Sequence, residues 1–118
     1  MKPTLVPGIA KTAAFTVGDD QTAPHVPVLS TPSMIGLIEG TCMGLAQEHL
    51  DDGELTVGTH VCVSHVGTAK VGEEISIDVR LRDIERRRLT FEVRVEGPNG
   101  LMSEGTHQRT VIASSRLG

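Results

Sequence analysis

The feature that most constrains this chain is a single change of hydrophobic period near residue 53. Residues 31 to 50 are rich in helix formers, with Thr31 as a candidate N-cap, Pro32 in the first turn and Gly53 just beyond the end. After Gly53 the apolar residues recur at every second position, which is typical of β-strands. One long helix followed by several strands therefore predicts a mixed fold.

One strand candidate precedes this helix and four follow it. They are residues 10–17, 56–66, 74–84, 89–96 and 101–113. Regular alternation of apolar and polar residues indicates antiparallel strands that are covered on one face. Residues 18–30 (GDDQTAPHVPVLS) show no period and are predicted to form a loop. The order β-α-β-β-β-β predicts an α+β fold, a curled antiparallel sheet of about five strands around one long helix.

Length and charge limit the classes of function. The 118 residues are expected to form one domain, residues 1–118. With 15 acidic and 11 basic residues, the chain lacks the positive field that would attract nucleic acids or anionic membranes. Phe15 and Phe91 are the only aromatic residues, which also argues against a surface that stacks bases. Neither nucleic acid nor a membrane is expected as a partner.

The two cysteines, Cys42 and Cys62, both fall in regular apolar segments, where a reduced cysteine is a small core residue. No apolar run is long enough for a signal peptide or a membrane span. These observations predict a cytoplasmic protein.

Glu39 is the first candidate for chemistry, because it lies within about 60° of Ile35 and Cys42 on a helical wheel. A carboxylate on the apolar stripe of a helix needs a partner, a proton or access to water. It either extends from the edge of the stripe to solvent or serves as a catalytic acid, base or nucleophile.

His65 is the second candidate. The strand period places it on one face with Val57, Thr59, Val61 and Val63. A histidine there is either a core residue bonded to the backbone or a catalytic group with an acceptor nearby, a role that Glu39 could fill.

Thr31 could serve as a helix cap and also hold a carbonyl oxygen or an anion at the positive end of the helix dipole.

A metal site is not expected. His60 and Cys62 point away from His65 on a regular strand, so one ion cannot bind all three. Arg86–Arg88 form the only basic run and are read as a solvated turn or as a phosphate contact. Arg109 shares a strand face with Gly105 and His107 and is either a rim ion pair or an anchor for a carboxylate or phosphate.

The segments TPSMIGLIE, GTHVCVSH, GEEISIDVRLRDIERRRLTFEVRV and SEGTHQRTVI together resemble the hot-dog-fold thioesterases, and within them the fluoroacetyl-CoA thioesterase group. The resemblance runs from about residue 31 to residue 112. It implies Thr31, Glu39 and His65 as the catalytic set, and Gly58 and Arg109 as substrate-binding residues. It also implies a homodimer with active sites at the interface, and CoA as part of the substrate with no separate cofactor.

The function implied is hydrolysis of a small acyl-CoA thioester to a free acid and CoA. Glu39 would act as nucleophile or general base, and His65 would polarise the thioester or move protons. The fluoroacetyl-specific enzyme has phenylalanines in a lid ahead of the helix, whereas residues 18–30 contain no aromatic residue. The resemblance therefore does not specify which acyl group the substrate carries. The alternatives are a hot-dog domain that binds acyl-CoA or another apolar ligand without turnover, and a hydratase or dehydratase.

Overall fold

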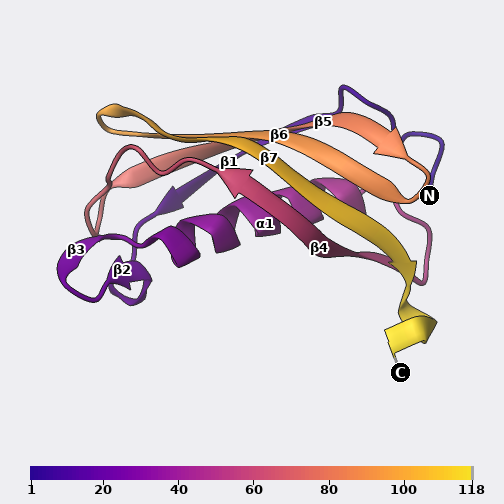
Figure 1. The fold of residues 1–118 in the computed structure, drawn as a ribbon, viewed down its shortest axis with the longest axis horizontal. Coiled ribbons are helices and arrows are strands. Elements are labelled where there is room, and N and C mark those ends of the chain that lie inside the picture. The colour runs from indigo at the N-terminus through magenta and orange to yellow at the C-terminus, as the bar shows by residue number, and fades with distance from the viewer. Residues whose placement is uncertain (118) are drawn as a thin grey trace.

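The computed structural model describes residues 1–117. Its elements are β1 (Ala10–Thr16), the 3-10 turn η1 (Asp19–Gln21), β2 (Thr22–Ala23), β3 (Val26–Leu29), α1 (Thr31–Gln47), β4 (Glu54–Val63), β5 (Glu74–Glu85), β6 (Arg88–Gly97), β7 (Gly100–Ala113) and the 3-10 turn η2 (Ser114–Leu117). Five strands form one antiparallel sheet in the order β1-β5-β6-β7-β4, and α1 packs across one face of it (Figure 1). The predicted α+β architecture is confirmed.

The core lies between α1 and the sheet, and alternation along the strands decides which residues enter it. On β5 the predicted inward residues are at most 2% exposed, and on β6 at most 4%. The polar residues between them face away from the helix. The buried apolar residues contributed by α1 are Met34, Ile38, Cys42, Leu45 and Ala46.

Ser30, rather than Thr31, caps the helix. The Ser30 side chain accepts a hydrogen bond from the backbone N–H of Ser33 at 3.2 Å. Thr31 is therefore the first helical residue, and its hydroxyl is free for another partner. The helix ends at Gln47, three residues earlier than predicted, because the chain turns at His49 and Leu50.

Residues 18–30 are not a plain loop, and that prediction is wrong. They form η1 and a small hairpin of β2 and β3, which lies beside the start of α1 (Figure 1). The hairpin is tied to the rest of the chain, since Leu29 N–H donates to the Ala69 carbonyl at 2.8 Å and Val28 forms a bridge with Lys70.

A β-bulge divides β4 into two halves of opposite phase. The register with β7 shifts between Gly58 and His60, so Val57 and Val61 point to opposite faces. The prediction of one shared face for residues 57 to 65 is therefore wrong. The bulge leaves Gly58, and not Val57, on the side that faces the helix.

The cysteine prediction is confirmed for Cys42, which is 0% exposed, and wrong for Cys62, which is exposed on β4. Both are free thiols. None of the helices within residues 1–117 combines the length and apolar character that crossing a membrane requires.

Candidate active site

The start of α1 brings two of the predicted catalytic residues together. Thr31 Oγ1 lies 2.7 Å from His65 Nδ1, a hydrogen-bond distance. His65 follows the end of β4, and its Nε2 is buried without a hydrogen-bond partner among the described residues. We call these two residues the helix-start pair.

Glu39 extends from α1 over the edge strand β4. Its side chain is 42% exposed, and its Oε2 lies 4.0 Å from Nη1 of Arg109. A methyl group at Gly58 would lie 2.8 Å from the same oxygen, so the absence of a side chain at Gly58 makes room for the carboxylate. Glu39 thus reaches solvent from the stripe edge and also has a charged partner.

Arg109 is buried rather than on the rim, with an exposed fraction of 5%. Its Nε donates to the Thr56 hydroxyl at 2.7 Å, and its Nη2 donates to the Thr56 carbonyl at 3.0 Å. Its Nη1 lies 3.2 Å from His107 Nε2. Since a guanidinium has five N–H groups, two remain for Glu39 or for a ligand.

His107 fixes the guanidinium from the sheet side. Its Nδ1 lies 2.8 Å from the His60 carbonyl and must donate to it, which leaves Nε2 as the acceptor for Arg109. Burial lowers the pKa of His107, the hydrogen bond to His60 opposes this shift, and the charge of Arg109 adds to it. A neutral His107 is the form that can accept from Arg109.

We call Glu39, Thr56, Gly58, His107 and Arg109 the Glu39 cluster. Cys42 lies near it on the helix, and burial raises the pKa of this thiol to about 12, against the opposing charge of Arg109 and with a smaller contribution from the charge of Glu39. Cys42 is therefore a thiol at neutral pH and not a nucleophile.

The helix-start pair and the Glu39 cluster lie apart in one chain. The helix rises about 12 Å from Thr31 to Glu39. Gly58 and His65 are separated by about 20 Å along the extended chain of β4 and the residues after it. Within residues 1–117 no hydrogen bond joins Glu39 to Thr31 or His65. One chain therefore holds the predicted catalytic residues in two separate groups.

The remaining candidates lie outside these two groups. In the part of the chain that the structure describes, no three His, Cys, Asp or Glu side chains form a metal-binding group. Arg87 contacts Glu54 at 3.3 Å, and Arg88 contacts Glu85 at 2.9 Å, on an exposed turn. These ion pairs favour the reading of the basic run as a solvated turn.

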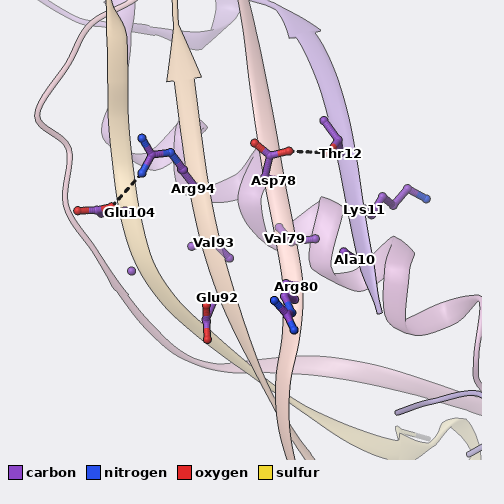
Figure 2. A pocket seen from close by; sticks show the side chains of 11 residues that line it. Ala10, Lys11, Thr12, Asp78, Val79, Arg80, Glu92, Val93, Arg94 and Glu104 are labelled. Atoms are coloured by element: carbon purple, nitrogen blue, oxygen red, sulfur yellow. Dashed lines mark hydrogen bonds and ion pairs between the residues drawn. The ribbon is translucent and has the colours of Figure 1, made fainter. Parts of the chain in front are cut away.

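A hollow of about 500 Å³ lies on the other face of the sheet, away from α1 (Figure 2). Its walls carry charged residues, several of which have partners, with Arg94 3.3 Å from Glu104 and Thr12 2.5 Å from Asp78. Neither the helix-start pair nor the Glu39 cluster lines it.

Sequence reasoning missed Thr56 and His107 as members of the Glu39 cluster. The signal for His107 was present, because the period of β7 places it on the face of Arg109. Thr56 could not be found, because its contact with Arg109 depends on the register between β4 and β7.

Comparison with solved structures identifies the fold class. A hot-dog-like protein from Thermanaerovibrio acidaminovorans superposes with a TM-score of 0.88 at 18% identity, over 98% of this chain and 87% of that one. The fluoroacetyl-CoA thioesterase FlK superposes with a TM-score of 0.90 at 29% identity, over 96% of this chain and 92% of that one. The single helix against a curled five-stranded sheet is thus a hot-dog fold.

The family follows from the sequence match. The model of the fluoroacetyl-CoA-specific thioesterase family, FlK, matches residues 10–115, and the chain belongs to this family. The fluoroacetyl-CoA thioesterase of Streptantibioticus cattleyicolor is 34% identical over 85 residues, which are 72% of this chain. The match spans 61% of the length of that relative.

Proposed function

We propose that this protein is an acyl-CoA thioesterase that hydrolyses a small acyl-CoA thioester to a free acid and CoA. The observation that carries the proposal is the Thr31–His65 hydrogen bond at 2.7 Å, in a chain that belongs to a thioesterase family. CoA is part of the substrate in this proposal, and no separate cofactor takes part.

The reaction needs attack on the thioester carbonyl and stabilisation of the negative charge that forms on its oxygen. When water attacks the carbonyl carbon, the C–S bond breaks, the acid is released, and the CoA thiolate takes up the proton that the water has lost. When the Glu39 carboxylate attacks, the C–S bond breaks and leaves an anhydride between Glu39 and the acyl group, which a water molecule then hydrolyses to the free acid and Glu39. The Thr31 hydroxyl and the helix N-terminus stabilise the oxyanion, and His65 moves protons through Thr31. Glu39 acts as general base towards water or as nucleophile.

Gly58 and Arg109 are proposed as substrate-binding residues. Gly58 leaves space beside the Glu39 carboxylate, and Arg109, with two unused N–H groups, has its Nη1 4.0 Å from the same carboxylate. A thioester placed there would lie between the attacking group and a fixed positive charge.

We propose that two copies of the chain pair through β4 and complete the site. β4 ends the sheet, so one side of its backbone has no neighbouring strand within residues 1–117. Antiparallel pairing centred between Val61 and Cys62 would bring His65 of the partner subunit opposite Gly58. Each site would then combine the helix-start pair of one subunit with the Glu39 cluster of the other.

Exposed Cys62 offers a direct test of this dimer. A short bismaleimide crosslinker should join two chains through Cys62, and Cys62→Ser should abolish the product because Cys42 is buried. A protein that runs as a monomer in light scattering and does not crosslink would contradict the dimer.

The test of the activity is release of free thiol from a panel of short, branched, aryl and halogenated acyl-CoAs. Glu39→Gln should lower turnover at least about a hundredfold if the carboxylate serves in acid–base catalysis. Glu92→Gln, on the exposed outer face of β6, is the matched control. Equal turnover by Glu39→Gln and wild type would end the proposed role of Glu39, and no thiol release from any acyl-CoA would end the proposed thioesterase.

The second candidate function is binding of acyl-CoA without turnover. The hairpin of residues 18–30, which contains no aromatic residue to close over an acyl group, favours it. Saturable acyl-CoA binding without thiol release from any member of the panel would decide for it.

We also propose a cytoplasmic location. The free thiols of Cys42 and Cys62 suit a reducing compartment.

A further inference from the structure

Two buried polar side-chain atoms lack a hydrogen-bond partner within residues 1–117. They are Nε2 of His65 and Oγ of Ser103. Ser103 is 0% exposed. A buried polar group without a partner is costly, so each such atom in a folded protein calls for an explanation.

The backbone places these two residues opposite each other. Beyond the end of β4 the ladder with β7 continues, since Ser64 N–H donates to the Glu104 carbonyl at 3.0 Å and Val66 N–H donates to the Met102 carbonyl at 2.7 Å. His65 therefore lies across from Ser103, as Val63 lies across from Gly105.

Both side chains point to the inner face of the sheet. Opposite residues of an antiparallel pair share a face, with Cβ atoms about 5 Å apart. Ser103 is paired on its other side with buried Val95, and His65 contacts Thr31 at the start of α1. The two atoms are not bonded to each other, although their residues are opposite each other on one face of the sheet.

We propose that Ser103 is a positioning residue for His65 and acts through one water molecule that bridges Ser103 Oγ and His65 Nε2. A buried water makes two to four hydrogen bonds to polar groups that otherwise lack partners, and these two groups meet that description. The only role of Ser103 in this proposal is to hold the bridging water, and its side chain does not touch the substrate.

The bridge would govern the chemistry of Thr31. A neutral imidazole carries one proton, so the hydrogen bond made at Nε2 decides whether Nδ1 accepts from the Thr31 hydroxyl or donates to it. In the first case Thr31 can lose its proton to His65, and in the second its hydroxyl is free to donate to the oxyanion. This inference rests on the proposed function, because it assigns a role within the same site.

The bridge is tested first without any substrate. A high-resolution crystal structure should show one water within hydrogen-bond distance of Ser103 Oγ and His65 Nε2. A dry gap, or a direct bond between the two side chains, would overturn the proposal. Side-chain nitrogen NMR should also show one dominant tautomer of His65 in the wild type and a changed tautomer ratio in Ser103→Ala.

The positioning role is tested by turnover. Ser103→Ala should lower kcat about tenfold, the effect of one lost hydrogen bond, and leave KM for acyl-CoA unchanged. Ser103→Thr, which keeps the hydroxyl, should restore most of the activity. Ser76→Ala makes the same chemical change on the outer face of β5 and should alter neither kcat nor the His65 signals.

The results separate this inference from the proposed function. If thioesters are hydrolysed and Ser103→Ala is as active as wild type, the positioning role is wrong while the thioesterase stands. If no variant hydrolyses a thioester, the thioesterase fails, and the crystal structure and tautomer ratio still decide the bridge.

Discussion

Gly58 is the residue on which the position of Glu39 most directly depends. A Cβ at this site would lie 2.8 Å from Glu39 Oε2, 3.3 Å from Arg109 Nη1 and 3.4 Å from His107 Cε1. The closest atom is the end of a flexible, partly exposed side chain, which can move away at little cost in stability. What such a movement changes is the direction in which the carboxylate points.

Gly58→Ala should therefore lower kcat/KM by at least about tenfold, because displacement of a reacting group by about 1 Å is enough for such a loss. The free energy of unfolding should change by less than about 1 kcal/mol. Gly36→Ala is the matched control, since a Cβ there meets nothing within 4 Å. Full activity of Gly58→Ala would show that the carboxylate is not held in a specific place.

The two thiols should differ in reactivity for a physical reason. Burial raises the pKa of Cys42 to about 12, whereas Cys62 is exposed. We expect one thiol per chain to react with a disulfide reagent at pH 8 in the native protein, and two in denaturant. Cys62→Ser should leave no reactive thiol in the native state, and fast reaction of this variant would contradict the buried position of Cys42.

At the scale of the element, the start of α1 links stability to the site. The Ser30 cap fixes the first turn, and Thr31 follows it directly and contacts His65. The first turn therefore both satisfies a helix donor and holds the hydroxyl of the helix-start pair.

Ser30→Ala should lower the free energy of unfolding by about 1 kcal/mol, the usual effect of a lost N-cap. Urea unfolding measures it, and turnover should fall as well because Thr31 loses its fixed position. Ser30→Asp, which keeps a capping oxygen, should recover most of both quantities. An unchanged unfolding midpoint in Ser30→Ala would show that the cap contributes little.

The β4–β7 pair carries a pH dependence through His107. Burial lowers the pKa of His107 in the folded chain, so between this value and about 6.5 the unfolded chain binds the additional proton. The contribution of His107 to the free energy of unfolding is then fully present above about pH 6.5. It falls as the pH decreases through this window, by at most about 1.4 kcal/mol per pH unit.

Thermal unfolding between pH 5 and pH 7.5 would measure this effect. The wild type should lose stability on acidification below about pH 6.5, and His107→Asn should show a flatter profile in the same range. Parallel profiles for the two proteins would assign the acid sensitivity to other groups.

At the scale of the whole molecule, the separation of the helix-start pair from the Glu39 cluster predicts how mutant subunits combine. If each site uses Glu39 of one subunit and His65 of the other, a heterodimer of Glu39→Gln and His65→Ala chains has one site with both residues intact. If both residues act within one chain, the heterodimer has none.

Equal mixing of the two inactive variants, with subunit exchange, should therefore recover about one quarter of the wild-type activity, since half of the dimers are mixed and each has one intact site. Thiol release after mixing measures it, and mixing Glu39→Gln with Glu39→Gln,His65→Ala is the control without recovery. No recovery in a population shown to contain heterodimers would place both groups of each site in one chain.

Much of this fold was open to prediction from the sequence, because its signals are local. The capping residues before Met34 and the period of two after Gly53 depend only on neighbours along the chain, and they predicted the helix and the five strands of the main sheet. The spacing of Thr31, Glu39 and His65, through the family resemblance, also predicted which side chains to examine.

Tertiary structure decided what those side chains touch. The bulge in β4 reversed the phase of the strand and placed Gly58 beneath Glu39, and no local pattern announces an extra residue in a ladder. The burial of Arg109 follows from the same pairing. The periodicity of apolar residues can be read from the sequence alone, because helices and strands each repeat with a fixed number of residues. Register, bulges and contacts between distant segments arise only when the strands pair.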